Sequence, residues 1–285
     1  MAAKLLDGKA FLEAEKERLK ARIEKLREQG IEPGLGTILV GDDPNSQSYI
    51  RHKHQASADI GLVSHHIELS QDSTQQDVLD AINKMNNDSK IHAFIVQLPL
   101  PKQCNEEEAL LAIDPKKDAD GLHPVNLGKL VMGTKAPRPC TPLGIQALIK
   151  EAGVDISGKN VLVIGRGLTI GRPLANLLTL KEDGANATVT VAHTGTKNLK
   201  EEALRSDVII AAVGSPSTVT KDMVKLGAVL VSAGMTFGDG RKLIPDIDED
   251  CAEVASYITP RIGGVGPTTI AMLLRNTIDA AELTL

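Results

Sequence analysis

The hydrophobic and polar positions of this chain follow two different periods. Apolar residues three and four apart across residues 11–29 predict a charged amphipathic helix, whereas the apolar run at 35–40 predicts a buried strand. Asp43-Pro-Asn-Ser predicts a turn that opens another helix. Further strands are predicted at 63–69, 91–97, 161–164, 187–192, 208–213 and 228–231. Because helical or loop segments separate these strands, the pattern predicts an α/β fold with parallel sheets.

One strand of this series ends on a glycine-rich turn. The sequence Gly165-Arg-Gly167-Leu-Thr-Ile-Gly171 follows the strand and leads into a helix with Pro173 in its first turn. Gly165 and Gly167 allow close approaches that a Cβ would block, and the helix start directs free N–H groups at a pyrophosphate. The spacing is one residue longer than the usual dinucleotide fingerprint, so an ordinary strand-to-helix turn is the alternative interpretation.

The next predicted strand, at 187–192, bears on the choice of nicotinamide cofactor. It ends without the Asp or Glu that would bind a ribose 2′-hydroxyl and repel a 2′-phosphate. Donors and cations suited to a phosphate lie close by instead: Arg166, Thr194, Thr196 and Lys197. The sequence therefore favours NADP over NAD, although Lys197 by itself also fits a solvated surface lysine.

Composition is typical of a soluble globular protein. The 285 residues fit about two domains, and a net charge of -5 with only 2% aromatic residues argues against a nucleic-acid surface. The longest uncharged stretch, 262–274, is too short and too rich in glycine and proline to span a bilayer, and the N-terminus has no apolar signal core. We therefore expect a cytoplasmic protein without membrane partners.

The three cysteines, Cys104, Cys140 and Cys251, are widely spaced and form no C-x-x-C pattern. Neither a disulfide framework nor a metal site is expected from them. The Thr141-Pro142 helix start follows a proline-containing connector and indicates a domain boundary. We expect two domains around a cleft: residues 1–140, and a Rossmann-like doubly wound parallel sheet at 141–266 that carries the glycine turn.

The chemistry is expected in the first domain, where Tyr49 and Lys53 lie four apart on a predicted helix and share one face. A lysine serves as acid, base or electrostatic anchor when burial and neighbouring charges lower its pKa toward neutrality. The simpler interpretation of Lys53 is an exposed lysine on a solvated face. Arg51, His52 and His54 are expected on the surface.

Two polar residues follow predicted strands. Gln97 closes the strand at 91–97, and a polar residue at the carboxyl end of a buried parallel strand is well placed to face a ligand. Asp120 lies in Lys117-Asp-Ala-Asp-Gly, for which an ordinary Asx turn is an equally good interpretation.

Six motifs together carry a family resemblance. They are Tyr49-x-x-x-Lys53, Val96-Gln-Leu-Pro-Leu-Pro101, Lys117-Asp-Ala-Asp-Gly121, Pro139-Cys-Thr-Pro142, Gly165-Arg with Gly171 and Pro173, and Gly263-Gly-Val-Gly-Pro267. In this order and at these spacings the chain resembles the bifunctional methylenetetrahydrofolate dehydrogenase/cyclohydrolase family. The resemblance runs from the first helix to the helix at 269–277, which is nearly the whole chain.

The resemblance implies an enzyme of one-carbon metabolism. It would oxidise 5,10-methylenetetrahydrofolate with NADP and hydrolyse the methenyl product to 10-formyltetrahydrofolate. Lys53 would be the key catalytic residue held by Gln97, Tyr49 would pack against the folate, and Asp120 would bind the aminopyrimidine edge of the pterin. Further site residues are implied at the substrate, Gly264 and Pro267, and at the cofactor, Gly165, Arg166, Gly167, Gly171, Thr194 and Lys197. No metal is implied.

The resemblance also implies a homodimer formed through the cofactor domain and a last helix, at 267–285, that packs back on the first domain. Departures from the family cluster in the cofactor half. Gly167 stands where a serine is common, Ser232-Ala-Gly-Met-Thr where an Asp-Val-Gly-Ile-Asn type of sequence is common, and Arg261-Ile where Val-Pro is common. We expect these changes to bear on cofactor affinity and dehydrogenase rate.

Two alternatives stay open on the sequence. A shikimate-dehydrogenase-like enzyme would also place a lysine and an aspartate ahead of a Rossmann domain. A non-catalytic folate or nucleotide sensor would bind a ligand without turning it over, although a pure binder need not keep Lys53.

Overall fold

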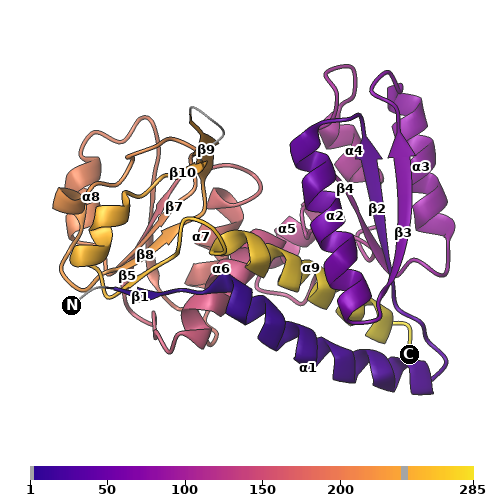
Figure 1. Ribbon diagram of the computed structural model, residues 1–285, viewed down its shortest axis with the longest axis horizontal. Coiled ribbons are helices and arrows are strands. Elements are labelled where there is room, and N and C mark those ends of the chain that lie inside the picture. Colours follow the sequence, from indigo (N-terminus) through magenta and orange to yellow (C-terminus); the bar gives the residue numbers. More distant parts are fainter. Residues whose placement is uncertain (1–2, 239–242) are drawn as a thin grey trace. The chain divides into compact units, whose positions relative to one another are not determined.

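The computed structural model describes residues 3–238 and 243–285, which divide into two compact units. The first unit contains Glu13–Cys140 and Ile270–Leu285, and the second contains Thr141–Thr269 with the chain's first residues up to Leu12. The division falls within two long helices, α1 (Gly8–Glu28) and α9 (Val265–Glu282), each of which contributes to both units (Figure 1).

The first unit is built on a three-stranded parallel sheet of order β3-β2-β4, formed by β2 (Gly34–Val40), β3 (Val63–Leu69) and β4 (Ala93–Val96). The central strand β2 is buried at every position, which explains its continuous apolar sequence, whereas the edge strand β3 alternates between exposed and partly buried positions. Four further helices complete the unit: α2 (Pro44–Asp59), α3 (Gln75–Asn87), α4 (Glu106–Ala112) and α5 (Pro124–Val131).

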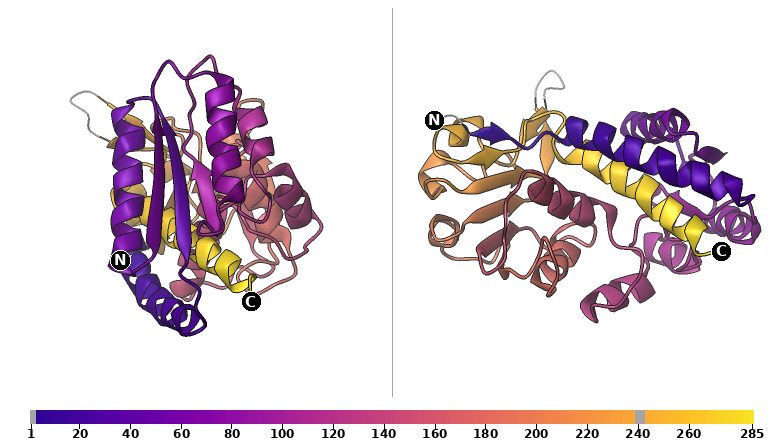
Figure 2. Two further views of the ribbon diagram at one scale, coloured as in Figure 1. Left: turned by 90° about the vertical axis from the view of Figure 1, so that its right-hand side faces the viewer. Right: turned by 90° about the horizontal axis from the view of Figure 1, so that it is seen from below.

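Helices cover both faces of this sheet, and α2 and α3 lie on opposite sides of the strands (Figure 2). Neighbouring residues of β2 show this, because successive side chains of a strand point to opposite faces. Thr37 reaches His54 of α2, while Ile38 packs in a buried cluster with Val78 and Ile82 of α3. Asp43 caps α2 by accepting the Ser46 amide at 2.8 Å, as the Asp-Pro-Asn-Ser sequence predicts.

Ion pairs join α1 and α9 within the first unit. Arg22 donates to Asp279 at 2.5 Å and to Glu282 at 2.8 Å, and Arg275 donates to the buried Glu15 at 2.7 Å. The last helix is therefore anchored in the first unit by charge-assisted hydrogen bonds.

The second unit contains a six-stranded parallel sheet of order β1-β11-β8-β7-β5-β6. Its strands are β1 (Lys4–Leu5), β5 (Asn160–Ile164), β6 (Thr188–Ala192), β7 (Val208–Ala211), β8 (Val229–Ser232) and β11 (Tyr257–Ile258). From β5 to β11 the strand order is that of flavodoxin-like sheets, which reverses direction between β5 and β7. Ligands of such sheets bind at the carboxyl ends of the two strands that flank this reversal.

Among the described residues of the second unit the other elements are helices, an antiparallel β9–β10 pair and the 3₁₀ turns η1 and η3. They are α6 (Cys140–Glu151), α7 (Gly171–Thr179), α8 (Leu199–Leu204), β9 (Met235–Phe237), β10 (Leu243–Pro245), η1 (Lys221–Met223) and η3 (Glu249–Glu253). The prediction of an α/β fold with parallel sheets is confirmed. Strands β1 and β11 escape sequence prediction because each is two residues long.

Candidate active site

Lys53 is the centre of a polar site in the first unit. It lies on α2 and is 7% exposed, so the interpretation of an exposed lysine on a solvated face is wrong. Its Nζ donates to Gln97 Oε1 at 3.0 Å. Gln97 follows β4, and its own Nε2 donates to the Leu98 carbonyl at 2.7 Å. That second bond fixes the amide so that its oxygen faces the ammonium group.

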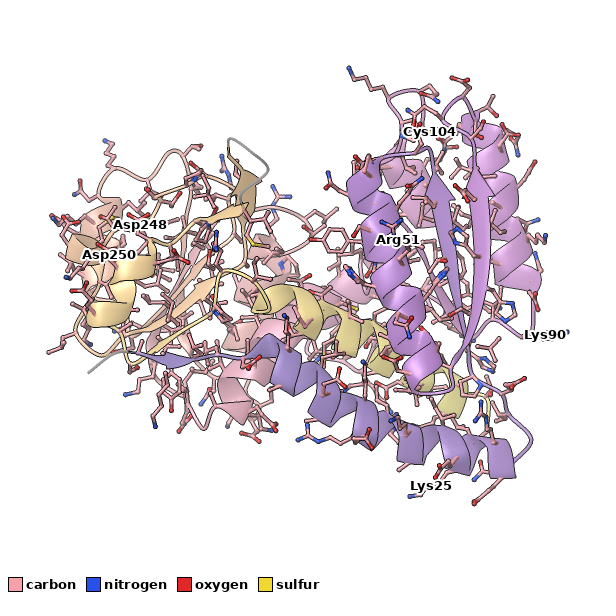
Figure 3. All side chains as sticks on the ribbon, in the orientation of Figure 1. Lys25, Arg51, Lys90, Cys104, Asp248 and Asp250 are labelled. Atoms are coloured by element: carbon pink, nitrogen blue, oxygen red, sulfur yellow. The ribbon has the colours of Figure 1, made fainter. Side chains whose placement is uncertain are left out.

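The neighbours of Lys53 on α2 differ in exposure. Tyr49, one turn earlier, is 50% exposed. Arg51 and His52 are exposed as predicted, and Figure 3 labels Arg51 on α2. His54 is half-buried, so its prediction as a surface residue is wrong.

The partner of His54 is Thr37 of β2. The Thr37 hydroxyl lies 2.8 Å from His54 Nε2 and 2.8 Å from His66 Nδ1, and the two rings meet edge to face with centroids 5.0 Å apart. Burial lowers the pKa of His54, and the positive charges of His66 and Lys53 lower it further. The neutral imidazole is therefore the form that the fold favours.

Two aspartates in the segment after β4 have different roles. Asp118 is buried, and its carboxylate accepts hydrogen bonds from Gly121 N at 2.9 Å, His123 N at 2.8 Å and Asn126 Nδ2 at 2.9 Å. These bonds build the turn, so the Asx-turn interpretation describes Asp118. Asp120 receives none of these three bonds, and the side chain that bonds its carboxylate is the Cys140 thiol.

Asp120 lies in the electrostatic field of Lys53. Burial raises the pKa of Asp120, the charge of Lys53 lowers it, and the negative charge of Asp118 raises it again, with a net increase above the ordinary value. Burial and the Asp120 charge also raise the pKa of the Cys140 thiol well above its usual range, so this thiol stays protonated. We call Lys53, Gln97 and Asp120 the lysine site.

The backbone beside Asp120 is held from α9. Asn276 donates its side-chain amide to the Ala119 carbonyl at 2.9 Å and to the Arg138 carbonyl at 3.0 Å. Gly121 has φ +70°, and a Cβ there would lie 2.3 Å from the Arg138 carbonyl carbon. The sequence did not lead us to predict a role for Asn276. The one signal it offered was a polar amide in a largely apolar helical stretch, and the structure shows that this residue is buried.

The glycine turn of the second unit, residues 165–171, has the geometry of a nucleotide cradle. Gly165 has φ +118°, and a Cβ there would lie 2.4 Å from the Ala212 carbonyl oxygen. A Cβ on Gly171 would lie 2.2 Å from the Gly165 carbonyl oxygen. The N-cap of α7, Ile170, makes no side-chain cap bond, the Arg172 amide donates to the Gly167 carbonyl at 3.1 Å, and Pro173 has no N–H, so the Gly171 amide is the group of the first turn left to face a phosphate. These features fit a dinucleotide pyrophosphate.

The candidate 2′-phosphate residues are exposed around the ends of β5 and β6. They are Arg166, Thr194 and Lys197. Within residues 3–238 and 243–285, neither Arg166 nor Lys197 has a carboxylate at ion-pair distance. Thr196 accepts the His193 amide at 2.9 Å and so shapes the loop itself.

No group of three or more metal-ligating side chains occurs in the described part of the chain. Nor does any helix there combine the length and hydropathy that crossing a membrane requires. Cys104, Cys140 and Cys251 are all free thiols and all buried.

Two family models match the chain in succession. The tetrahydrofolate dehydrogenase/cyclohydrolase catalytic domain matches residues 6–120, and the NAD(P)-binding domain of the same family matches residues 139–285. The chain belongs to this family. Family membership confirms the predicted resemblance and the prediction of an enzyme with a nicotinamide-binding domain, and it argues against the shikimate-dehydrogenase-like alternative.

Members of the family are similar over their full length. The bifunctional protein FolD of Syntrophotalea carbinolica is 51% identical over 282 residues, which cover 99% of this chain and 97% of that protein. The FolD structure from Campylobacter jejuni has a TM-score of 0.96 at 42% identity and covers 100% of both chains. The Trypanosoma brucei enzyme, solved with NADP cofactor and inhibitor, has a TM-score of 0.93 at 36% identity and covers 100% of this chain and 99% of its own.

The departures from the family's common sequence have local structural accounts. Among the described residues, apart from the two chain neighbours of Gly167, no atom lies within 4 Å of a Cβ built on it, so the serine that is common there would fit. Ser232 accepts the Asp246 amide on its hydroxyl at 3.1 Å, a bond that an aspartate could also accept. Arg261 lies 3.5 Å from Glu249 and forms a half-exposed ion pair.

Gly264 and Pro267 belong to the second unit, where α9 begins. Gly263 has φ +88°, and a Cβ on Gly8 would lie 1.7 Å from the Gly264 carbonyl oxygen, so the start of α1 packs against this glycine segment. Pro267 lies in the first turn of α9, where its missing N–H costs no hydrogen bond. Their role at the substrate stays a prediction.

Proposed function

We propose that the protein oxidises 5,10-methylenetetrahydrofolate to the methenyl cation with NADP and hydrolyses that cation to 10-formyltetrahydrofolate. The observation that carries this proposal is the buried Lys53 held by Gln97 within the field of Asp120, in a chain of this family. A buried ammonium bonded to a neutral amide is suited to proton transfer rather than to a structural ion pair.

Asp120 is the anchor for the pterin. The aminopyrimidine edge of a pterin presents N–H donors, and a carboxylate that makes few bonds within the protein is the matching acceptor. Tyr49, half-exposed one turn from Lys53, supplies a flat apolar face for the conjugated rings of the folate. These two contacts set the substrate against α2 and the end of β4.

The hydrolytic step uses Lys53 as the proton carrier. The positive charge of the bound methenyl cation favours the neutral form of the neighbouring Lys53 amine. Water adds its oxygen to the methenyl carbon, and this neutral amine takes one proton from that water. The tetrahedral product then breaks its bond to N5 of the folate, N5 receives the proton from Lys53, and the remaining hydroxyl proton leaves to solvent as the formyl C=O forms. Gln97 holds the amine in place by the 3.0 Å bond throughout.

The residues of the glycine turn fit a dinucleotide. Gly165 and Gly171 leave room where a Cβ would collide with backbone, and the start of α7 offers the Gly171 N–H to the pyrophosphate. Arg166, Thr194 and Lys197 are the residues that would hold a 2′-phosphate. When bound, NADP supplies the hydride acceptor for the oxidation.

The assembly is implied by the resemblance, and the location is expected from composition and the N-terminal sequence. A homodimer formed through the second unit, and a cytoplasmic location without nucleic-acid or membrane partners, stay predictions. Chromatography with light scattering on the purified chain measures the dimer directly.

A single absorbance experiment tests the function. Methylenetetrahydrofolate is mixed with enzyme and either NADP or NAD, and reduced cofactor and methenyl product are followed together; purified methenyltetrahydrofolate is then used alone. We expect NADP-dependent reduction and an enzyme-accelerated loss of the methenyl signal. Folate binding by calorimetry without either signal would favour the sensor instead.

A further inference from the structure

The loop that follows β7, Val213–Ser215, lies at the reversal of strand order in the second unit. The sheet reverses between β5 and β7, so this loop and the glycine turn after β5 flank the same crevice. Sequence reasoning extended the β7 strand to residue 213, but the strand ends at Ala211. Beyond the strand, a carboxylate accepts the hydrogen bonds of the next backbone amides.

That carboxylate is Asp246, which is 0% exposed and follows β10. Its Oδ2 accepts Val213 N at 2.7 Å and Gly214 N at 3.1 Å, and its Oδ1 accepts Ser215 N at 2.8 Å. Three successive amides on one carboxylate define the path of a loop that has no strand partner of its own. Bonds of this charge-assisted kind are among the strongest available to a backbone.

The contacts around Asp246 show how closely this arrangement is fitted. A Cβ on Gly234 would lie 2.1 Å from Asp246 Oδ2, so position 234 accommodates only glycine. Gly214 has φ +64°, a left-handed conformation that suits its place in the loop, and its carbonyl accepts the Thr236 hydroxyl.

The fixed loop contacts the glycine turn. A Cβ built on Gly165 would lie 2.4 Å from the Ala212 carbonyl oxygen and 3.3 Å from Val213 Cγ1. Val213 is 41% exposed, so it presents part of its apolar side chain at the crevice. The position of this wall depends on the amides that Asp246 holds.

We propose that Asp246 is a positioning residue for the nicotinamide cofactor: by holding the Val213–Ser215 loop it sets one wall of the cofactor crevice beside Gly165. The proposal rests on the proposed NADP-dependent function. Asp246 acts through Val213 and the loop backbone. The cyclohydrolase should not depend on it, because Lys53, Gln97 and Asp120 all belong to the first unit.

The test is Asp246→Asn, with NADP affinity measured by calorimetry and both activities measured on the same folded sample. Asn keeps the size but exchanges one accepting oxygen for a donor that faces N–H groups. We expect the NADP Kd and KM to rise about ten-fold or more, since small displacements of a binding wall are costly, with cyclohydrolase within about two-fold of wild type. A purely structural role would lower melting temperature and leave the NADP constants of the folded fraction unchanged, and that result would overturn the proposal.

Asp248→Asn is the matched control. Asp248, labelled in Figure 3, lies two residues further on and accepts the Ser217 hydroxyl at 2.8 Å, so its loss should leave NADP affinity unchanged. If Asp246→Asn does not fold, Thr236→Val removes the bond to the Gly214 carbonyl without burying an unpaired group. We expect a smaller rise in NADP Kd, about two- to five-fold, and an unchanged Kd would count against the proposal. Absence of NADP binding and turnover in the wild type would instead refute the proposed function.

Discussion

Lys53 and Gln97 are joined by a 3.0 Å hydrogen bond that runs from the middle of α2 to the carboxyl end of β4. The bond crosses 44 residues of sequence and places an ammonium group where a parallel sheet presents its ligand-binding edge. Gln97 is itself fixed by its bond to the Leu98 carbonyl. The ammonium is therefore oriented before any substrate arrives, which is the condition for efficient proton transfer.

Asp120→Asn is predicted to weaken folate binding and stabilise the free protein. Loss of a charge-assisted acceptor costs about 1.5 to 3 kcal/mol, or roughly ten- to a hundred-fold in affinity. Burial raises the pKa of Asp120 in the folded protein. The contribution of Asp120 to the free energy of unfolding is therefore fully present below the pKa that Asp120 has in the unfolded chain, and it is lost as pH rises through its pKa in the folded protein. At neutral pH the neutral amide should raise the melting temperature. Calorimetry and thermal unfolding measure both effects.

The control is Asp118→Asn, which removes an acceptor that holds three donors. It should lower the melting temperature, because those donors lose a charged partner in a buried turn. A lower melting temperature in Asp120→Asn, or unaltered folate affinity, would contradict the assignment of Asp120 as the substrate anchor.

Arg166→Ala is predicted to lower the NADP-to-NAD ratio of kcat/KM by roughly ten- to a hundred-fold, chiefly through NADP. The reason is that the exposed guanidinium has no carboxylate partner among the described residues and is free to bind a 2′-phosphate. Lys159 is an exposed cation at the amino end of β5. Lys159→Ala is the control and should leave kcat/KM unchanged with both NADP and NAD. A wild-type preference for NAD, or an unaltered ratio in Arg166→Ala, sinks the 2′-phosphate assignment.

Gly167→Ser is predicted to tighten NADP binding about two- to ten-fold, as one neutral hydrogen bond contributes. The space is present, because among the described residues, apart from the two chain neighbours of Gly167, no atom lies within 4 Å of a Cβ built there. Gly165→Ser is the contrast, since its Cβ would lie 2.4 Å from the Ala212 carbonyl oxygen, and it should abolish NADP binding. Weaker binding by Gly167→Ser in a calorimetric titration would mean that the serine hydroxyl does not reach the phosphate.

His54→Gln is predicted to make the melting temperature less dependent on pH on the acid side of neutrality. The folded protein holds the His54 pKa below its ordinary value through burial and through the charges of His66 and Lys53. The contribution of His54 to the free energy of unfolding is present above the pKa of histidine in the unfolded chain, about 6.5, and it is lost as pH falls through the pKa of His54 in the folded protein. Melting temperature from about pH 7.5 to about pH 5 should therefore fall less steeply in His54→Gln. The exposed His52→Gln is the control, and identical slopes for His54→Gln and wild type would disprove the role of His54.

Local sequence signals predicted the elements well and their contacts poorly. The i to i+4 spacing of Tyr49 and Lys53 predicts a shared helix face, but which face is buried depends on β4, which the spacing does not contain. Asp118 and Asp120 are indistinguishable in sequence, and the backbone amides that Asp118 accepts separate this turn former from Asp120, whose side-chain partner is the Cys140 thiol.

The most distant contacts were beyond any local pattern. Asn276 bonds a carbonyl 157 residues away, and Asp246 accepts the Val213 amide, which the strand pattern at 208–213 assigns to the sheet. Both are buried polar groups whose partners are backbone atoms, and backbone atoms leave no signature in a single sequence. The glycine turn was predicted because its constraint, the absence of a Cβ, is written in residue type.

The most direct test of the account is methenyltetrahydrofolate hydrolysis by Lys53→Met. Met keeps the length of the side chain and removes the amine, and Arg51→Met, an exposed cation on the same helix, is the control. Lys53→Met should fold and should lose at least about a hundred-fold in rate after the spontaneous rate is subtracted, while Arg51→Met keeps wild-type activity. Hydrolysis by folded Lys53→Met within a few-fold of wild type would contradict the central claim that Lys53 carries the proton.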